Sequence, residues 1–194
     1  MSRVLITGAG GNGYGAQVAK ALHQAGRHAL IGADAKPARP SYVPFESVGR
    51  LPRASDPSYL ESLIERYRSE GCEALFDGSE PEMRLLSRSR ERLASEGIRW
   101  IANAGEVIER CMDKSALSSW LEQKGFATPR SWTVGAEKDA DRIDRYPVVV
   151  KPNADSGASN HVYVAQSPAE LRALFTWLAR PWSDFCFQEY VGTP

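Results

Sequence analysis

The chain has 194 residues, of which 42% are hydrophobic and 25% charged, as in a soluble protein with one large or two small domains. Lysine and arginine together number 24, and so do aspartate and glutamate, so no net charge attracts nucleic acid or an anionic membrane. No apolar run approaches the roughly 20 residues of a membrane span. The three cysteines lack metal or redox spacing, which predicts reduced thiols in a cytoplasmic protein.

The N-terminal residues predict a strand, a helix and a second strand. An apolar strand at residues 4–7 leads into Gly8, Gly10 and Gly13, which have GxGxxG spacing. The second strand, at 28–33, ends at Asp34, where an acid would hold the ribose of a dinucleotide. Glycines in such a turn either admit a pyrophosphate or let a helix pack closely on a strand, so two interpretations remain. The Tyr-x-x-x-Lys pair of a short-chain dehydrogenase is missing.

Strands and helices continue to alternate after a proline-rich segment. Residues 36–57 contain five prolines and predict a long surface connection. The elements predicted next are a helix at 58–71, a strand at 74–76, a helix that ends at Gly97 and a strand at 98–102. This alternation predicts a parallel sheet covered on both faces, with ligands at the carboxyl ends of its strands. Glu80 and Glu82 at that edge either offset a helix dipole or contact a substrate amine.

The pattern changes near Glu109, where we place a domain boundary. A short helix leads to Asp113 and Lys114, and a further helical face extends to Gly125. Residues 131–134 and 146–151 are predicted to be antiparallel strands. The remaining predicted elements are a strand at 161–165, a helix at 168–180 and a strand at 185–191.

The segment at 147–152 places three valines between two prolines, which predicts a short strand buried on both faces. Lys151 ends this strand, and an unpaired ammonium there is costly unless an anion meets it. The loop at 155–159 supplies hydroxyls and unhindered backbone N–H groups, which are the groups that surround phosphate oxygens. The segment therefore predicts a polyphosphate site. The alternative is a solvated lysine followed by a turn.

Three ordered signatures resemble the ATP-grasp superfamily, and within it proteins such as the large subunit of carbamoyl-phosphate synthetase. They are Asp113-Lys114 with Leu117 and the turn at 125–129, then residues 146–159, then residues 187–192. The resemblance spans the whole chain and implies an α/β fold in two parts. A Rossmann-like, parallel-sheet pre-ATP-grasp domain would occupy residues 1–109. A truncated α+β N-terminal ATP-grasp subdomain, with linker helix, lid and the start of the adenine hinge, would occupy residues 110–194.

The resemblance also implies roles for individual residues. Two lysines would contact the ATP phosphates, a loop would close over them, and a hinge would present its backbone to the adenine edge. The residues assigned in this way are Lys114 and Lys151, then Ser156, Gly157 and Ser159 of the loop, then Gln188, Glu189 and Val191 of the hinge. The loop has one glycine where family members usually place two or more. The catalytic residues and the ligands of Mg²⁺ are expected beyond Pro194.

The leading interpretation is the ATP-binding N-terminal portion of a carboxylate–amine (or similar) ligase that works through an acyl phosphate. Such an enzyme would use ATP, Mg²⁺ and a small-molecule carboxylate, and this chain alone is expected to be inactive. One alternative is a non-catalytic nucleotide-binding module or fragment. Another is an NAD-binding Rossmann oxidoreductase that uses residues 8–13 and Asp34. The last strand is expected to leave Phe187 and Tyr190 at an exposed apolar face through which chains associate.

Overall fold

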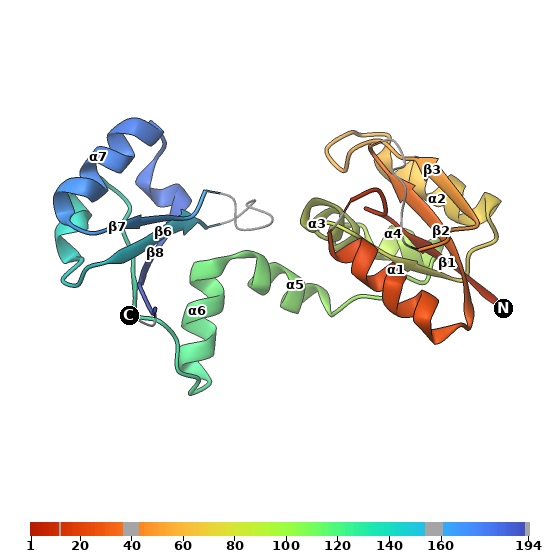
Figure 1. Cartoon of the computed structure of the whole chain (residues 1–194), viewed down its shortest axis with the longest axis horizontal. Helices are drawn as coiled ribbons and strands as arrows, with labels where there is room; N and C mark the ends of the chain where they lie inside the picture. The colour runs from red at the N-terminus through yellow and green to blue at the C-terminus, as the bar shows by residue number, and fades with distance from the viewer. Residues whose placement is uncertain (12, 37–42, 154–160, 193–194) are drawn as a thin grey trace. The chain divides into compact units, whose positions relative to one another are not determined.

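The computed structural model describes residues 1–11, 13–36, 43–153 and 161–192, and the chain forms two compact units, Met1–Ile108 and Glu109–Pro194 (Figure 1). Both units combine helices with a sheet, and the first has a parallel sheet, so the predicted α/β fold is confirmed. Among the helices that these residues form, none has both the length and the apolar character to span a membrane.

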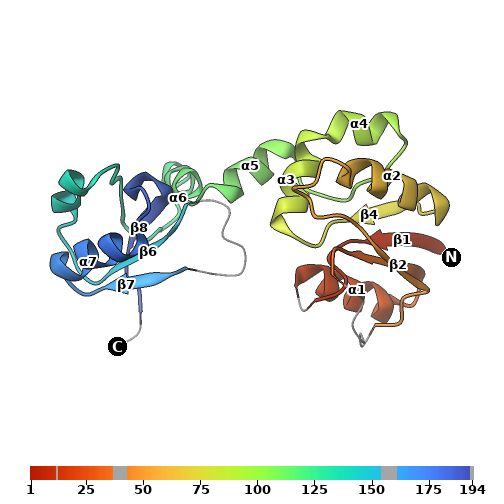
Figure 2. The same cartoon turned by 90° about the horizontal axis from the view of Figure 1, so that it is seen from above.

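The first unit is a parallel sheet between two layers of helices. Its strands lie in the order β3-β2-β1-β4 and are β1 (Ser2–Ile6), β2 (His28–Asp34), β3 (Ser47–Arg50) and β4 (Ala74–Phe76). The helix on one face is α1 (Tyr14–Ala25), and those on the other are α2 (Tyr59–Ser69), α3 (Glu80–Arg88) and α4 (Arg90–Ser95) (Figure 2). Side chains alternate along β1, so Val4 and Ile6 join the core under α1, whereas Leu5 joins the core under α2.

Three details of this unit differ from the prediction. Strand β3 lies within the segment predicted to be a connection and pairs with β2 from Ile31 to Asp34. The expected strand at 98–102 is reduced to one parallel bridge between Leu75 and Trp100. The expected helix to Gly97 is divided at Ser89 into α3 and α4. The two strand differences involve partners that are distant in sequence.

Glycines allow the β1–α1 turn and the β4–α3 turn to lie in contact. A Cβ atom at Gly78 would be 2.0 Å from the carbonyl oxygen of Thr7, and one at Gly15 would be 2.5 Å from the same oxygen. Gly8 has a φ of +61°, in the left-handed region that favours glycine. The glycine-rich turn is therefore required for close backbone packing.

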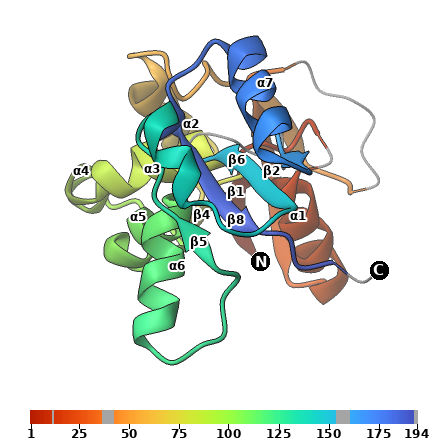
Figure 3. The same cartoon turned by 90° about the vertical axis from the view of Figure 1, so that its left-hand side faces the viewer.

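The second unit is an antiparallel sheet with strand order β5-β8-β6-β7 (Figure 3). Its strands are β5 (Ser131–Trp132), β6 (Val148–Pro152), β7 (Tyr163–Ala165) and β8 (Phe185–Glu189). Its helical elements are α6 (Lys114–Gln123), α7 (Pro168–Leu178) and the 3-10 helices η1 (Glu137–Arg142) and η3 (Trp182–Asp184), while α5 (Gly105–Met112) spans the division between the units. The predicted pairing of 131–134 with 146–151 is wrong, because β8 pairs with both β5 and β6.

The two faces of this sheet differ in character. Val148, Val150 and Phe187 are fully buried in the core beneath α7, where Phe175 stacks on Trp182 with ring centroids 3.9 Å apart. The expectation that Phe187 is exposed is therefore wrong. The neighbouring positions on β6 lie on the other face and are only half-buried, so β6 is not buried on both faces as predicted.

The contact at Gly78 gives a test of the first unit. We expect Gly78→Ala to lower the free energy of unfolding by about 1–3 kcal/mol, because the new methyl group overlaps the Thr7 carbonyl. Urea unfolding followed by circular dichroism measures this. Gly11→Ala in the same turn is the control, since the nearest atom to a Cβ there is 3.9 Å away. Equal stability of the two variants would contradict the packing role.

Candidate functional site

Two lysines predicted to bind phosphate lie near each other in the second unit. Lys114 is the first residue of α6, and its Nζ is 3.4 Å from the carbonyl oxygen of Asn153. Lys151 lies on β6, opposite Cys186 of β8, so both side chains occupy the face toward α6. We call Lys114, Ser115, Lys151, Asn153 and Cys186 the lysine cluster.

The pKa of the Cys186 thiol depends on the charges of the lysine cluster. Burial raises its pKa most, smaller opposing contributions come from a hydrogen bond with Ser115 and from the positive charges of Lys151 and Lys114, and the negative charge of Asp113 raises it further. Both ammonium groups thus lie close enough to act on one buried sulfur atom. Positive charge at this end of the sheet favours an anion with several negative oxygens.

Asn153 joins the end of β6 to the start of α6. Its carbonyl oxygen accepts from the Lys114 N–H at 3.2 Å, and its Oδ1 accepts from the Ser115 N–H at 3.0 Å and from the Ser115 hydroxyl at 2.9 Å. Its own N–H donates to the carbonyl oxygen of Asp184 at 2.8 Å. Asn153 therefore connects the start of α6, which carries Lys114, to the end of β6, which carries Lys151.

The predicted hinge forms the end of β8, and its residues have different environments. Gln188 is buried, and its Nε2 donates to the hydroxyls of Ser118 at 3.2 Å and Ser131 at 3.1 Å. It lies about 7 Å further along β8 than Cys186, on the same face. The Gln188 side chain thus ties the hinge to α6 and β5.

Glu189 and Val191 continue the hinge beyond Gln188. The Glu189 N–H donates to the carbonyl of Arg130 at 2.8 Å, and its carboxylate pairs with Arg145 at 2.6 Å, which lowers the pKa of Glu189. Val191 follows the last paired residue of β8 and is 74% exposed. The Glu189 N–H is already used by the protein itself, whereas Val191 lies beyond the paired part of the strand.

Some of the predicted site falls outside this description. Ser156, Gly157 and Ser159 lie outside the described residues. Within the described ranges, the structure contains no group of three or more His, Cys, Asp or Glu side chains that could hold a metal ion.

At the carboxyl edge of the first sheet, acids that the sequence singles out bond to the protein itself. Asp34 accepts from the Gly10 N–H at 2.8 Å and from the Lys36 N–H at 2.7 Å, so both of its oxygens hold the local chain. Buried Glu82 accepts from Tyr59 at 2.9 Å and from Ser79 at 2.8 Å. These acids stabilise the turns at this edge.

Asp77 belongs to the same edge and has two aromatic partners. It accepts from the hydroxyl of Tyr14 and, at 2.9 Å, from the indole N–H of Trp100. Burial, followed by the hydrogen bond to Asp77, raises the pKa of Tyr14, so Tyr14 stays a protonated donor. Asp77 thereby links the start of α1 to the segment after α4.

Sequence reasoning missed Asn153, Ser115 and Ser118. Ser115 and Asn153 are 38 positions apart, and no spacing rule connects a helix start with the end of a strand at that distance. The sequence signal for these three residues was only that polar residues occur close to each lysine along the chain.

Comparisons with known proteins identify the first unit and the overall fold. Residues 4–101 match the family model described as PylC-like, N-terminal domain. No curated protein gives a significant match. Solved structures that resemble the chain include N5-carboxyaminoimidazole ribonucleotide synthetase from Thermotoga maritima, with a TM-score of 0.67 and 16% identity over 98% of this chain and 46% of that chain.

Two further structures resemble the chain over 98% of its length and 44% of theirs. L-amino acid ligase from Bacillus licheniformis has a TM-score of 0.67 and 16% identity. The biotin carboxylase domain of 2-oxoglutarate carboxylase from Hydrogenobacter thermophilus, determined with MgADP and bicarbonate, has a TM-score of 0.63 and 19% identity. The chain spans less than half the length of these three structures, and at such identities the likeness concerns the fold.

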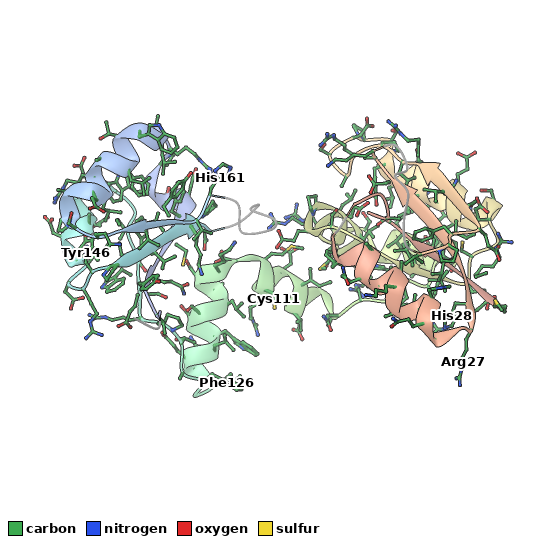
Figure 4. The ribbon with its side chains drawn as sticks, viewed as in Figure 1. Arg27, His28, Cys111, Phe126, Tyr146 and His161 are labelled. Carbon is green, nitrogen blue, oxygen red and sulfur yellow. The ribbon has the colours of Figure 1, made fainter. Side chains whose placement is uncertain are left out.

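The reactivities of the three cysteines test whether Cys186 of the lysine cluster is buried. Cys111 on α5 is exposed (Figure 4), whereas Cys72 and Cys186 are 8% and 2% exposed. Burial raises the pKa of Cys72 to about 11 and also raises that of Cys186, so both have little reactive thiolate. Ellman's reagent should therefore modify one thiol rapidly in the native chain, and Cys111→Ser should abolish that phase. A rapid phase that persists in Cys111→Ser would contradict the burial of the other two.

Proposed function

The chain belongs, through residues 4–101, to the family of PylC-like N-terminal domains, and its fold is that of ATP-grasp ligases; on this premise we propose that it is the ATP-binding N-terminal portion of a carboxylate–amine (or similar) ligase. The observation that carries the proposal is that Lys114 is held to Asn153 at the end of β6, the strand that carries Lys151 opposite Cys186. Two ammonium groups at one end of a sheet supply the charge that a nucleotide polyphosphate requires.

The proposed roles follow from the positions of these groups. Lys114 and Lys151 bind the phosphate oxygens and reduce the charge that develops during phosphoryl transfer. The exposed backbone around Val191 faces the adenine edge, next to the ordered residues Gln188 and Glu189. Buried Gln188 keeps the hinge in register with α6.

ATP fits the donor set of the lysine cluster, and bound ATP would supply the phosphoryl group that activates a carboxylate as an acyl phosphate. The related biotin carboxylase domain was determined with MgADP, which supports Mg²⁺ as the accompanying ion. The chain's own contribution is to bind and orient the phosphates.

Assignments narrower than the superfamily rest on the sequence signatures and on the exposed residues after β8. Likeness to the large subunit of carbamoyl-phosphate synthetase rests on the three sequence signatures. We further propose a small-molecule carboxylate substrate, a cytoplasmic location and association between chains through half-exposed Tyr190 and exposed Val191. A non-catalytic nucleotide-binding module would use the same lysine cluster and would lack turnover.

The NAD-binding alternative is disfavoured by the geometry of the glycine-rich turn. Asp34, the acid that would hold a dinucleotide ribose, binds the turn itself through the N–H groups of Gly10 and Lys36, one on each oxygen. Gly15 and Gly78 are needed for backbone packing. The turn therefore has a structural explanation that involves no nucleotide.

Replacing Lys151 in the full-length protein tests the proposed function. Lys151→Ala should weaken ATP binding about 10- to 100-fold, because a charge-assisted hydrogen bond to phosphate is lost. Isothermal calorimetry with Mg²⁺ present measures the affinity. Lys124→Ala, which removes one positive charge after α6, is the matched control and should bind like the wild type. ATP affinity and turnover that are unchanged in Lys151→Ala would contradict the assignment.

A further inference from the structure

The start of α6 has backbone N–H groups that its own helix cannot satisfy, as at every helix N-terminus. Asp113, the N-cap residue, accepts from one of them, since its Oδ1 takes the Ala116 N–H at 2.8 Å, while its carbonyl oxygen accepts the first helical hydrogen bond, from the Leu117 N–H at 2.9 Å. The N–H groups of Lys114 and Ser115 donate instead to Asn153. A residue at the end of β6 therefore completes the cap of α6.

Asn153 is held firmly enough to act as such a cap. Its N–H is bound to Asp184, its carbonyl oxygen to Lys114, and its Oδ1 to both donors of Ser115. It also follows Pro152, the last paired residue of β6. Its position is thus set by the sheet, and it transmits that position to the first turn of α6.

This connection fixes one candidate phosphate-binding lysine relative to the other. Lys114 begins the capped helix, and Lys151 lies two residues before Asn153 on β6. If the cap is removed, the first turn of α6 can fray and the separation of the two ammonium groups is no longer determined.

The chemistry of the capping group suits a phosphate site. The asparagine amide is neutral, so it accepts the helix N–H groups without adding negative charge beside the lysines. An aspartate at this position would also accept both Ser115 donors, but it would attract the ammonium groups and compete with an anionic ligand. The Asp113 carboxylate already caps α6 beside Lys114, and the neutral Asn153 adds no second negative charge there.

We propose that Asn153 is a positioning residue of the nucleotide site, which sets the spacing of Lys114 and Lys151 for a polyphosphate by capping α6 from β6. The inference rests on the proposed function, since it assumes that these lysines bind phosphate. It adds a specific distinction: Asn153 supports recognition of the phosphates and does not contribute to recognition of the nucleoside.

The test compares two ligands in the full-length protein. Asn153→Ala should weaken ATP binding about tenfold in calorimetry, because the hydrogen bonds that order the first turn of α6 are lost. Adenosine, which lacks phosphates, should bind Asn153→Ala and wild type equally. Thr128→Ala, which removes a 2.8 Å hydrogen bond to Glu122 near the opposite end of α6, is the matched control and should leave both affinities unchanged.

A second variant and a second measurement separate positioning from misfolding. Ser115→Ala removes only the hydroxyl donor and should cause a smaller loss of ATP affinity, about threefold. The double variant should bind no more weakly than Asn153→Ala alone, since both changes remove the same hydrogen bond. In a Cys111→Ser background, Asn153→Ala should increase the rate at which Cys186 reacts with Ellman's reagent, because α6 no longer covers it.

The outcomes distinguish the inference from its premise. Wild-type protein that fails to bind ATP would overturn the proposed function and the inference with it. If Lys151→Ala weakens ATP binding and Asn153→Ala does not, only the inference is overturned. An equal loss of ATP and adenosine affinity in Asn153→Ala would also overturn it, since that result indicates a general structural role.

Discussion

The hydrogen bonds between Asn153 and the first turn of α6 determine how the second unit presents its charged groups. Strand β6 sends Val148 and Val150 into the core under α7 and turns Lys151 toward α6. Because Asn153 then binds the start of α6, Lys114 lies near the same end of the sheet. The antiparallel sheet therefore separates an aromatic core on one face from a polar, lysine-bearing face on the other.

The second connection between α6 and the sheet is the buried amide of Gln188. Its hydrogen bonds to Ser118 and Ser131 join β8, α6 and β5, about 7 Å along β8 from the thiol opposite Lys151. Two neutral amides, Asn153 and Gln188, thus hold α6 together with the Asp113 carboxylate at its N-cap. A nucleotide with its phosphates at Lys114 and Lys151 and its base at the exposed end of β8 would follow this face.

The first unit shows why a sequence motif alone does not establish a binding site. Gly8, Gly10 and Gly13 have dinucleotide-binding spacing, yet the acid that should hold a ribose binds the turn itself. Asp77 and Glu82 likewise accept hydrogen bonds from aromatic and serine donors of the protein itself. Gly8, together with Gly15 and Gly78, serves backbone packing, and the buried carboxylates fix the turns at the carboxyl edge of the sheet.

The sequence was most informative where a pattern was local. Apolar runs and glycine or proline boundaries located β1, β2, β4 and α2, because each forms from its own periodicity. Strand β3 was missed because Ser47, Val48, Gly49 and Arg50 have no apolar alternation and become a strand by pairing with β2. The position of β8 between β5 and β6, and the capping of α6 by Asn153, depend on contacts between distant segments. Lys151 was singled out by the strand that it ends and Lys114 by family resemblance, and the structure adds Asn153, which ties Lys114 to the end of that strand.

The most direct test of the central claim is a crystal structure of the full-length protein with Mg²⁺ and a non-hydrolysable ATP analogue. The account predicts phosphate oxygens within hydrogen-bonding distance of the Nζ atoms of Lys114 and Lys151, with the adenine edge against the backbone at residues 189–191. A nucleotide bound instead at the glycine-rich turn, with its ribose on Asp34, would contradict it.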